Sequence, residues 1–131
     1  MPSLFAGLGC QRNCPASALA DLLDTTLAHH GLTRADLAGI GSIDLKADEP
    51  GLLQLASELG LKLVVFSAAQ LAAFEGQLTH RSALAFAHTG CHGVAESTAL
   101  AMAGRGATLR VTRQKNAQAT LALAQPGKNP G

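Results

Sequence analysis

The stretch LKLVVF at residues 61–66 decides the fold class, because a short run of large apolar and β-branched side chains predicts a β-strand. A helix is predicted on each side of it. On the N-terminal side, residues 48–50 (DEP) form a helix start with Asp48 as the expected N-cap, and this helix should end at Gly60. On the C-terminal side, residues 67–70 (SAAQ) form a capping box that opens another helix. Strands that alternate with helices are typical of α/β proteins.

The same alternation continues toward both ends of the chain. Residues 4–9 (LFAGLG) and 37–43 (LAGIGSI) are predicted strands, and a helix with a single apolar stripe lies between them. The stripe consists of Leu19, Leu22, Leu23, Thr26 and Leu27. A later helix, with an inner stripe at residues 94–102, precedes two closing strands at residues 107–112 and 120–124. We therefore predict a three-layer α/β/α fold with a mixed, mostly parallel sheet of about five strands.

Length and composition fit one cytoplasmic domain at residues 1–124, followed by a flexible tail at residues 125–131. The 10 basic residues nearly balance 9 acidic ones, and four Phe are the only aromatic side chains, so no nucleic-acid partner is predicted. No run approaches the roughly 20 apolar residues that span a membrane. The three cysteines are an odd number, which argues against a disulfide framework.

The first candidate site follows the first predicted strand, because ligands bind beyond the carboxyl ends of strands in open α/β sheets. Gly7 and Gly9 invite comparison with a dinucleotide-binding loop, but Arg12 stands at the third glycine position, so no nucleotide cofactor is predicted. Arg12 near a helix start could still bind a carboxylate or phosphate. The alternative is that the glycines only permit a tight turn. Cys10 is either a nucleophile or an ordinary buried residue.

The second candidate site is the segment SIDLKADE at residues 42–49, which follows the second predicted strand. Lys46 could pair with an anionic substrate, and Asp44 or Glu49 could move a proton. The alternative interpretation is that the acidic residues cap a helix while Lys46 is solvated. Both interpretations stay open.

The third candidate site is the turn HTGCHG at residues 88–93. His88, Cys91 and His92 resemble metal ligands in type, but no fourth ligand stands at a recognisable spacing, so no metal site is predicted. Glu96 is expected at the third position of the next helix, where a carboxylate supports the cap. Its alternative role is that of an acid beside the turn.

Read together, five segments are similar to the CobE/CbiG C-terminal domain family of cobalamin biosynthesis, in its stand-alone, CobE-like form. They are residues 7–12 (GLGCQR), 42–52 (SIDLKADEPGL), 66–67 (FS), 89–96 (TGCHGVAE) and 120–124 (TLALA). The first loop departs from the family pattern, since Gln11 replaces an arginine and Asn13 replaces a glycine.

The resemblance implies a place in the aerobic cobalamin pathway, with a precorrin or corrin intermediate bound by a carrier or accessory protein and no cofactor. The substrate-binding residues would be Gly7, Gly9, Cys10, Arg12, Ser42, Lys46, Ser67, Thr89 and Gly90. One alternative is a lactone or C–C hydrolase, or a lyase, acting on the macrocycle. Its acid or base would be Asp44, Glu49 or Glu96. The other alternative is a scaffold for neighbouring biosynthetic enzymes.

Overall fold

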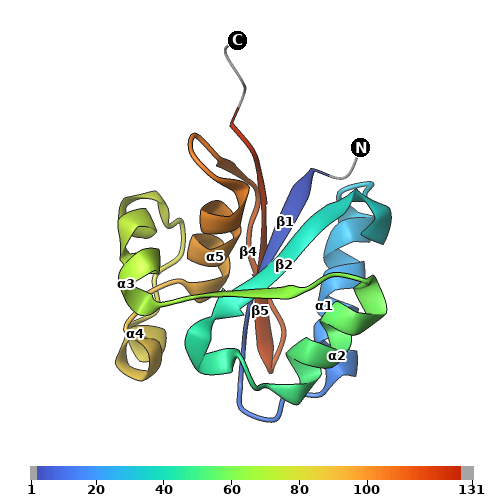
Figure 1. Ribbon diagram of the computed structural model, residues 1–131, viewed down its shortest axis with the longest axis horizontal. Helices are drawn as coiled ribbons and strands as arrows, with labels where there is room; N and C mark the ends of the chain where they lie inside the picture. Colours follow the sequence, from blue (N-terminus) through green and yellow to red (C-terminus); the bar gives the residue numbers. More distant parts are fainter. Residues whose placement is uncertain (1–2, 128–131) are drawn as a thin grey trace.

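The computed structural model describes residues 3–127 and shows one five-stranded sheet between two layers of helices (Figure 1). The strands are β1 (Leu4–Cys10), β2 (Leu37–Ile43), β3 (Leu63–Phe66), β4 (Thr108–Lys115) and β5 (Ala119–Gln125). The α-helices are α1 (Ala16–His29), α2 (Pro50–Leu59), α3 (Ala68–Leu71), α4 (Ala83–Thr89) and α5 (Val94–Ala103). Three 3₁₀ helices are η1 (Arg34–Asp36), η2 (Asp44–Lys46) and η3 (Ala72–Gln77).

The sheet has the order β3-β2-β1-β5-β4 and is mixed. β1 pairs in parallel with β2, and β2 with β3, so the carboxyl ends of these three strands lie at one edge. β5 runs antiparallel to β1, and β4 runs antiparallel to β5. The predicted mixed α/β sheet of about five strands is therefore confirmed, and so is the closing pair of strands.

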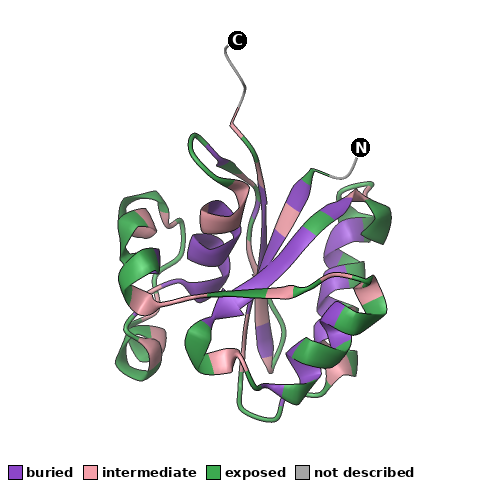
Figure 2. Ribbon diagram, in the orientation of Figure 1, coloured by how far each residue is buried: buried purple, intermediate pink, exposed green. Residues whose placement is uncertain are grey.

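Each face of the sheet has its own core (Figure 2). On one face, α1 and α2 pack large side chains such as Leu19 and Leu52 against Leu8 of β1. On the other face, α5 packs small residues such as Ala95 and Ala99 against Ala122 of β5. Small residues permit a close approach of helix and sheet, which explains why this alanine-rich sequence can still form a dense core.

Two helices, α1 and α2, show how well local sequence patterns predict the structure. All five residues of the predicted α1 stripe are buried, as expected. Asp48 was predicted as the N-cap of α2, but the N-cap is Glu49. The Glu49 carboxylate accepts a hydrogen bond from the backbone N–H of Asn13, which joins the α2 start to the loop after β1, while Asp48 is exposed to solvent.

Most of the predicted tail at residues 125–131 lies outside the described residues, and Gln125 is the last residue of β5. Within the described part of the chain, the structure contains no helix whose length and apolar character would allow it to cross a membrane.

Candidate functional site

The carboxyl ends of the parallel strands meet the beginning of α5 at one edge of the sheet. A Cβ atom added at Gly9, near the end of β1, would lie 3.7 Å from the Val94 side chain at the start of α5. Val94 also shares a buried cluster with Ile43, the last residue of β2, and with Cys91. Phe66, the last residue of β3, packs against the same cluster. The three predicted candidate sites are thus brought to a common edge.

Cys10, Lys46 and Glu49 form one electrostatic group at this edge. Burial raises the pKa of Cys10 to about 12, although the positive charge of Lys46 opposes that rise. The nearby Cys14 and Glu49 add to it. The Cys10 thiol therefore stays protonated at neutral pH, and a thiol of this kind is a poor nucleophile.

Cys10 is accordingly expected to react slowly with iodoacetamide in the native protein at pH 8. A pKa about three units above normal lowers the thiolate fraction roughly a thousandfold, and the greater nucleophilicity of the thiolate restores part of that loss. The net rate should be about thirtyfold below that of free cysteine. Peptide mass analysis after timed alkylation measures it, with guanidinium-unfolded protein as the control. Native alkylation at the rate of free cysteine would contradict this description of the site.

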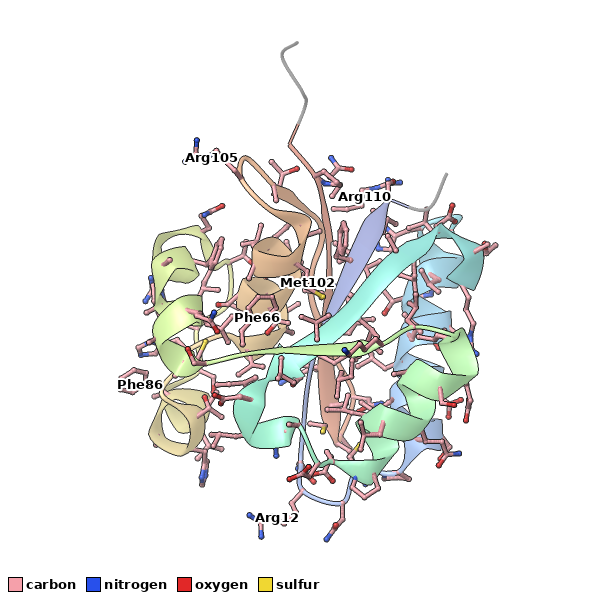
Figure 3. All side chains as sticks on the ribbon, viewed as in Figure 1. Arg12, Phe66, Phe86, Met102, Arg105 and Arg110 are labelled. Atoms are coloured by element: carbon pink, nitrogen blue, oxygen red, sulfur yellow. The ribbon has the colours of Figure 1, made fainter. Side chains whose placement is uncertain are left out.

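Arg12 lies at the tip of the loop between β1 and α1 and points into solvent (Figure 3). The neighbouring Asn13 has a φ of 62°, in the left-handed region that glycine and asparagine adopt most readily. Asparagine can therefore replace the family glycine without a change in the loop's path. Gln11 ties the loop to the β4–β5 turn, since its backbone N–H donates to the carbonyl of Gln118.

Lys46 is half-buried at the end of η2 and forms no ion pair within residues 3–127. Asp44, at the other end of η2, is exposed. Lys46 is therefore a cation at the sheet edge that is available to an anionic ligand.

The two buried carboxylates are occupied by hydrogen bonds from the protein. Glu49 accepts the N–H of Asn13, as described above. Glu96 is 1% exposed and accepts the backbone N–H groups of Thr79, His80 and Arg113, as well as the Thr79 hydroxyl. Glu96 stands at the third position of α5, as predicted. The sequence suggested that it supports the cap of its own helix, but in the structure it anchors two distant segments.

The hydrogen bonds of Glu96 also determine the protonation state of its carboxyl group. Burial raises the pKa of the carboxyl group, but the hydrogen bonds from Thr79 and from the three backbone N–H groups outweigh burial and bring the pKa below its ordinary value. Glu96 is thus a permanently ionised anchor at neutral pH. A carboxylate in this state is a poor proton donor.

The remaining predicted binding residues divide into a set at the common edge and a set buried within the sheet. Ser67 is the N-cap of α3, and Gly90 lies within contact distance of Ala68 in the same helix. The Thr89 hydroxyl donates to the carbonyl of Ala85, within its own helix. These residues lie along the common edge. Gly7 and Ser42 do not reach it, because Gly7 is covered by α5 and the Ser42 hydroxyl donates to the carbonyl of Leu8 in the sheet.

A groove that the sequence does not predict opens on the α5 face of the sheet, between the second half of α5 and β3. Its volume is about 370 Å³. Its lining includes Phe5, Gly39, Lys62, Val64, Phe66 and Met102, and Figure 3 shows Phe66 and Met102 toward the middle of the molecule. Gly39 and Gly41 leave one face of β2 without side chains, and Phe5 and Met102 pack into that space.

Within the described part of the chain, no group of three or more His, Cys, Asp or Glu side chains is placed to hold a metal ion. His92 instead stacks on Phe86, with ring centroids 4.2 Å apart, and its Nδ1 atom lies 3.1 Å from Glu75. Cys91 is buried beside Ser97.

Comparison with known proteins identifies relatives along nearly the whole chain. The model of the family described as "Cobalamin synthesis G C-terminus" matches residues 4–124. A protein named CobE from Sinorhizobium sp is 42% identical over 123 residues, which is 94% of this chain and 80% of that protein. The crystal structure of CobE, a protein from the cobalamin (vitamin B12) biosynthetic pathway, matches with a TM-score of 0.89 and 44% identity. That match covers 95% of this chain and 92% of the other.

One relative is an enzyme of greater length. The cobalt-precorrin-5A hydrolase of Priestia megaterium is 31% identical over 121 residues, which is 92% of this chain. The match spans only 32% of the hydrolase. The comparisons confirm the resemblance found in the motifs.

Proposed function

Because this chain belongs to the family of the cobalamin synthesis G C-terminus, it is a cobalamin biosynthesis protein, and we propose that it binds a precorrin or corrin intermediate as a carrier or accessory protein in the cytoplasm. The ligand would lie across the carboxyl edge of the parallel strands. Gly9, Cys10, Arg12 and Lys46 would contact it from one side. Ser67, Thr89 and Gly90, at the α3 and α4 ends, would contact it from the other.

The observation that carries this proposal is the state of the ionisable groups at the edge. The two buried carboxylates are held by hydrogen bonds, and the Cys10 thiol is held protonated. Lys46 and Arg12, by contrast, form no ion pair within the described residues. Precorrins and corrins carry several acetate and propionate groups, which unpaired cations can bind. The edge is therefore better suited to holding a polycarboxylate than to transferring a proton.

The test is a titration of the protein with precorrin and corrin intermediates, followed by absorbance, with mass analysis of the recovered ligand. The proposal expects saturable binding and an unchanged ligand mass. A changed mass would make the protein an enzyme, with exposed Asp44 as the remaining candidate acid. Absence of binding by every intermediate would overturn the proposal and direct attention to protein partners.

Removing the two cations should weaken this binding. Lys46→Ala is expected to raise the Kd about tenfold, because Lys46 is half-buried and less screened by water. Arg12→Ala should raise it only about threefold, since Arg12 is exposed. Arg110→Ala, which removes an exposed cation of β4 at the opposite end of the molecule from Arg12 (Figure 3), is the matched control and should leave the Kd within twofold. An unchanged Kd in both test variants would show that the ligand lies elsewhere.

A further inference from the structure

The groove on the α5 face adjoins the carboxyl edge at Phe66 and differs from it in chemistry. It is bordered by the first half of β2, by β3 and by the second half of α5, so it lies away from the Arg12 loop (Figure 3). Its walls are mostly apolar. The rings of Phe5 and Phe66, the Met102 thioether and the exposed Val64 side chain all contribute to them.

The glycines of β2 let two side chains that line the groove pack close to the strand. A Cβ atom added at Gly39 would lie 2.8 Å from the Phe5 ring, and one added at Gly41 would lie 2.9 Å from the Met102 sulfur. Side chains at these positions would push Phe5 and Met102 outward. Gly39 and Gly41 are themselves buried, so the accessible wall of the groove over β2 is formed by the Phe5 and Met102 side chains. A second hollow of about 350 Å³, lined in part by Phe74 and Arg105, adjoins the first at Ala101.

The charges around the two hollows have one sign. Lys62 lines the first hollow and Arg105 the second, and no carboxylate lines either of them. Neither cation forms an ion pair within residues 3–127. Ligand sites are typically apolar concavities of a few hundred Å³ with a small number of polar groups that fix orientation. A ligand that matches the apolar walls and the positive charge has a flat apolar ring system with a negative charge at its rim.

We propose that the groove bounded by Phe5, Val64, Phe66 and Met102 is a second ligand-binding site, which takes an apolar ring system that carries an anionic group. The rings lie against the side chains of Phe5, Phe66 and Met102, and Lys62 or Arg105 binds the anion. This inference goes beyond the proposed function and does not depend on it.

The test uses a matched pair of fluorescent probes. Anilinonaphthalene sulfonate has the required rings and charge, and N-phenylnaphthylamine has the same rings without the sulfonate. Both should bind the wild-type protein. The Lys62→Ala/Arg105→Ala double variant should raise the Kd of the sulfonate about five- to tenfold and leave that of the neutral probe within twofold.

Two neighbouring residues of β3 supply a matched pair of variants. Val64 is 40% exposed and lines the groove, while Val65 is 37% exposed and faces the other side of the sheet, since successive strand residues alternate. Val64→Glu should raise the Kd of both probes at least tenfold. Val65→Glu introduces the same charge one residue away and should leave both values within twofold. Thermal unfolding of each variant checks that the fold is retained.

Several results would overturn the inference. They are failure of either probe to bind, equal effects of Val64→Glu and Val65→Glu, and equal effects of the double variant on the charged and neutral probes. None of them bears on corrin binding at Lys46, so failure of one proposal is distinguishable from failure of the other. Titration of a corrin into probe-loaded protein identifies the natural source of the ligand. Displacement would indicate the macrocycle itself, and retention would indicate a smaller aromatic or polyene acid.

Discussion

Replacement of Glu96 with alanine is expected to lower the free energy of unfolding by about 3–5 kcal/mol. The carboxylate is 1% exposed and accepts the N–H groups of Thr79, His80 and Arg113. Without it, three backbone donors lose their acceptor where water has little access, and each such loss costs about 1–3 kcal/mol. Denaturant titration of the two proteins measures the difference. Glu75→Ala is the control, because Glu75 is more exposed, and its loss should cost about 1 kcal/mol or less.

The same carboxylate should make stability depend on pH. Its pKa in the folded protein is lowered, so it binds a proton less readily there than in the unfolded chain. Its contribution is therefore complete above the ordinary pKa of 4.5 and is lost as pH falls through 4.5 toward the lower folded value. The stability difference between wild type and Glu96→Gln should shrink over that range. A constant difference down to pH 3 would contradict the assigned role.

Glu96 also illustrates what the sequence could not reveal. Its place at the third position of α5 was predictable from the helix start, because that signal is local. Its partners stand 16 or 17 residues away on either side, in a loop and in β4. The register of β4 against β5 shifts between Val111 and Gln114, and Glu96 accepts the N–H of Arg113 within that irregular stretch. Sequence periodicity carries no information about such long-range pairing.

The elements themselves were more predictable than their contacts. The α1 stripe and the Ser67 capping box follow from spacing alone, because a helix buries one face and its first turn needs a cap. α4 has no buried residue, so its sequence contains no apolar stripe from which the helix could be predicted. β3 was predicted from its apolar run, but the run did not indicate that β3 is an edge strand with an exposed Val64. The groove depends on that exposure.

The location of the candidate site was predictable from the sequence, but only some of the residues predicted for it lie there. Strand ends of a parallel sheet must share one edge, so Cys10 and Lys46 could be expected to lie close together. Which glycines face a ligand and which face a helix depends on strand register and helix packing. Gly9 lies at the edge, whereas Gly7, two residues earlier, is covered by α5.

Gly7→Ala is therefore expected to lower the free energy of unfolding by about 3 kcal/mol or more. A Cβ atom at this position would overlap the carbonyl oxygen of Ala95 and lie 2.6 Å from the backbone nitrogen of Ala99. Both are backbone atoms of α5, so no side-chain rotation can make room for the methyl group. The helix must move away from β1 and open the core that it shares with β5. Thermal and denaturant unfolding measure the loss.

Two further variants separate this explanation from a general effect of glycine replacement. Gly76→Ala places a methyl group where no other atom lies within 4 Å, so its stability should stay within about 0.5 kcal/mol of wild type. Ala99→Gly combined with Gly7→Ala should restore nothing, because the overlap is with the helix backbone and not with the Ala99 side chain. Rescue by that second substitution, or a loss below 1 kcal/mol for Gly7→Ala, would mean that α5 approaches β1 less closely than the structure shows. Unchanged corrin affinity in the folded fraction of Gly7→Ala would place Gly7 among the packing residues and outside the ligand site.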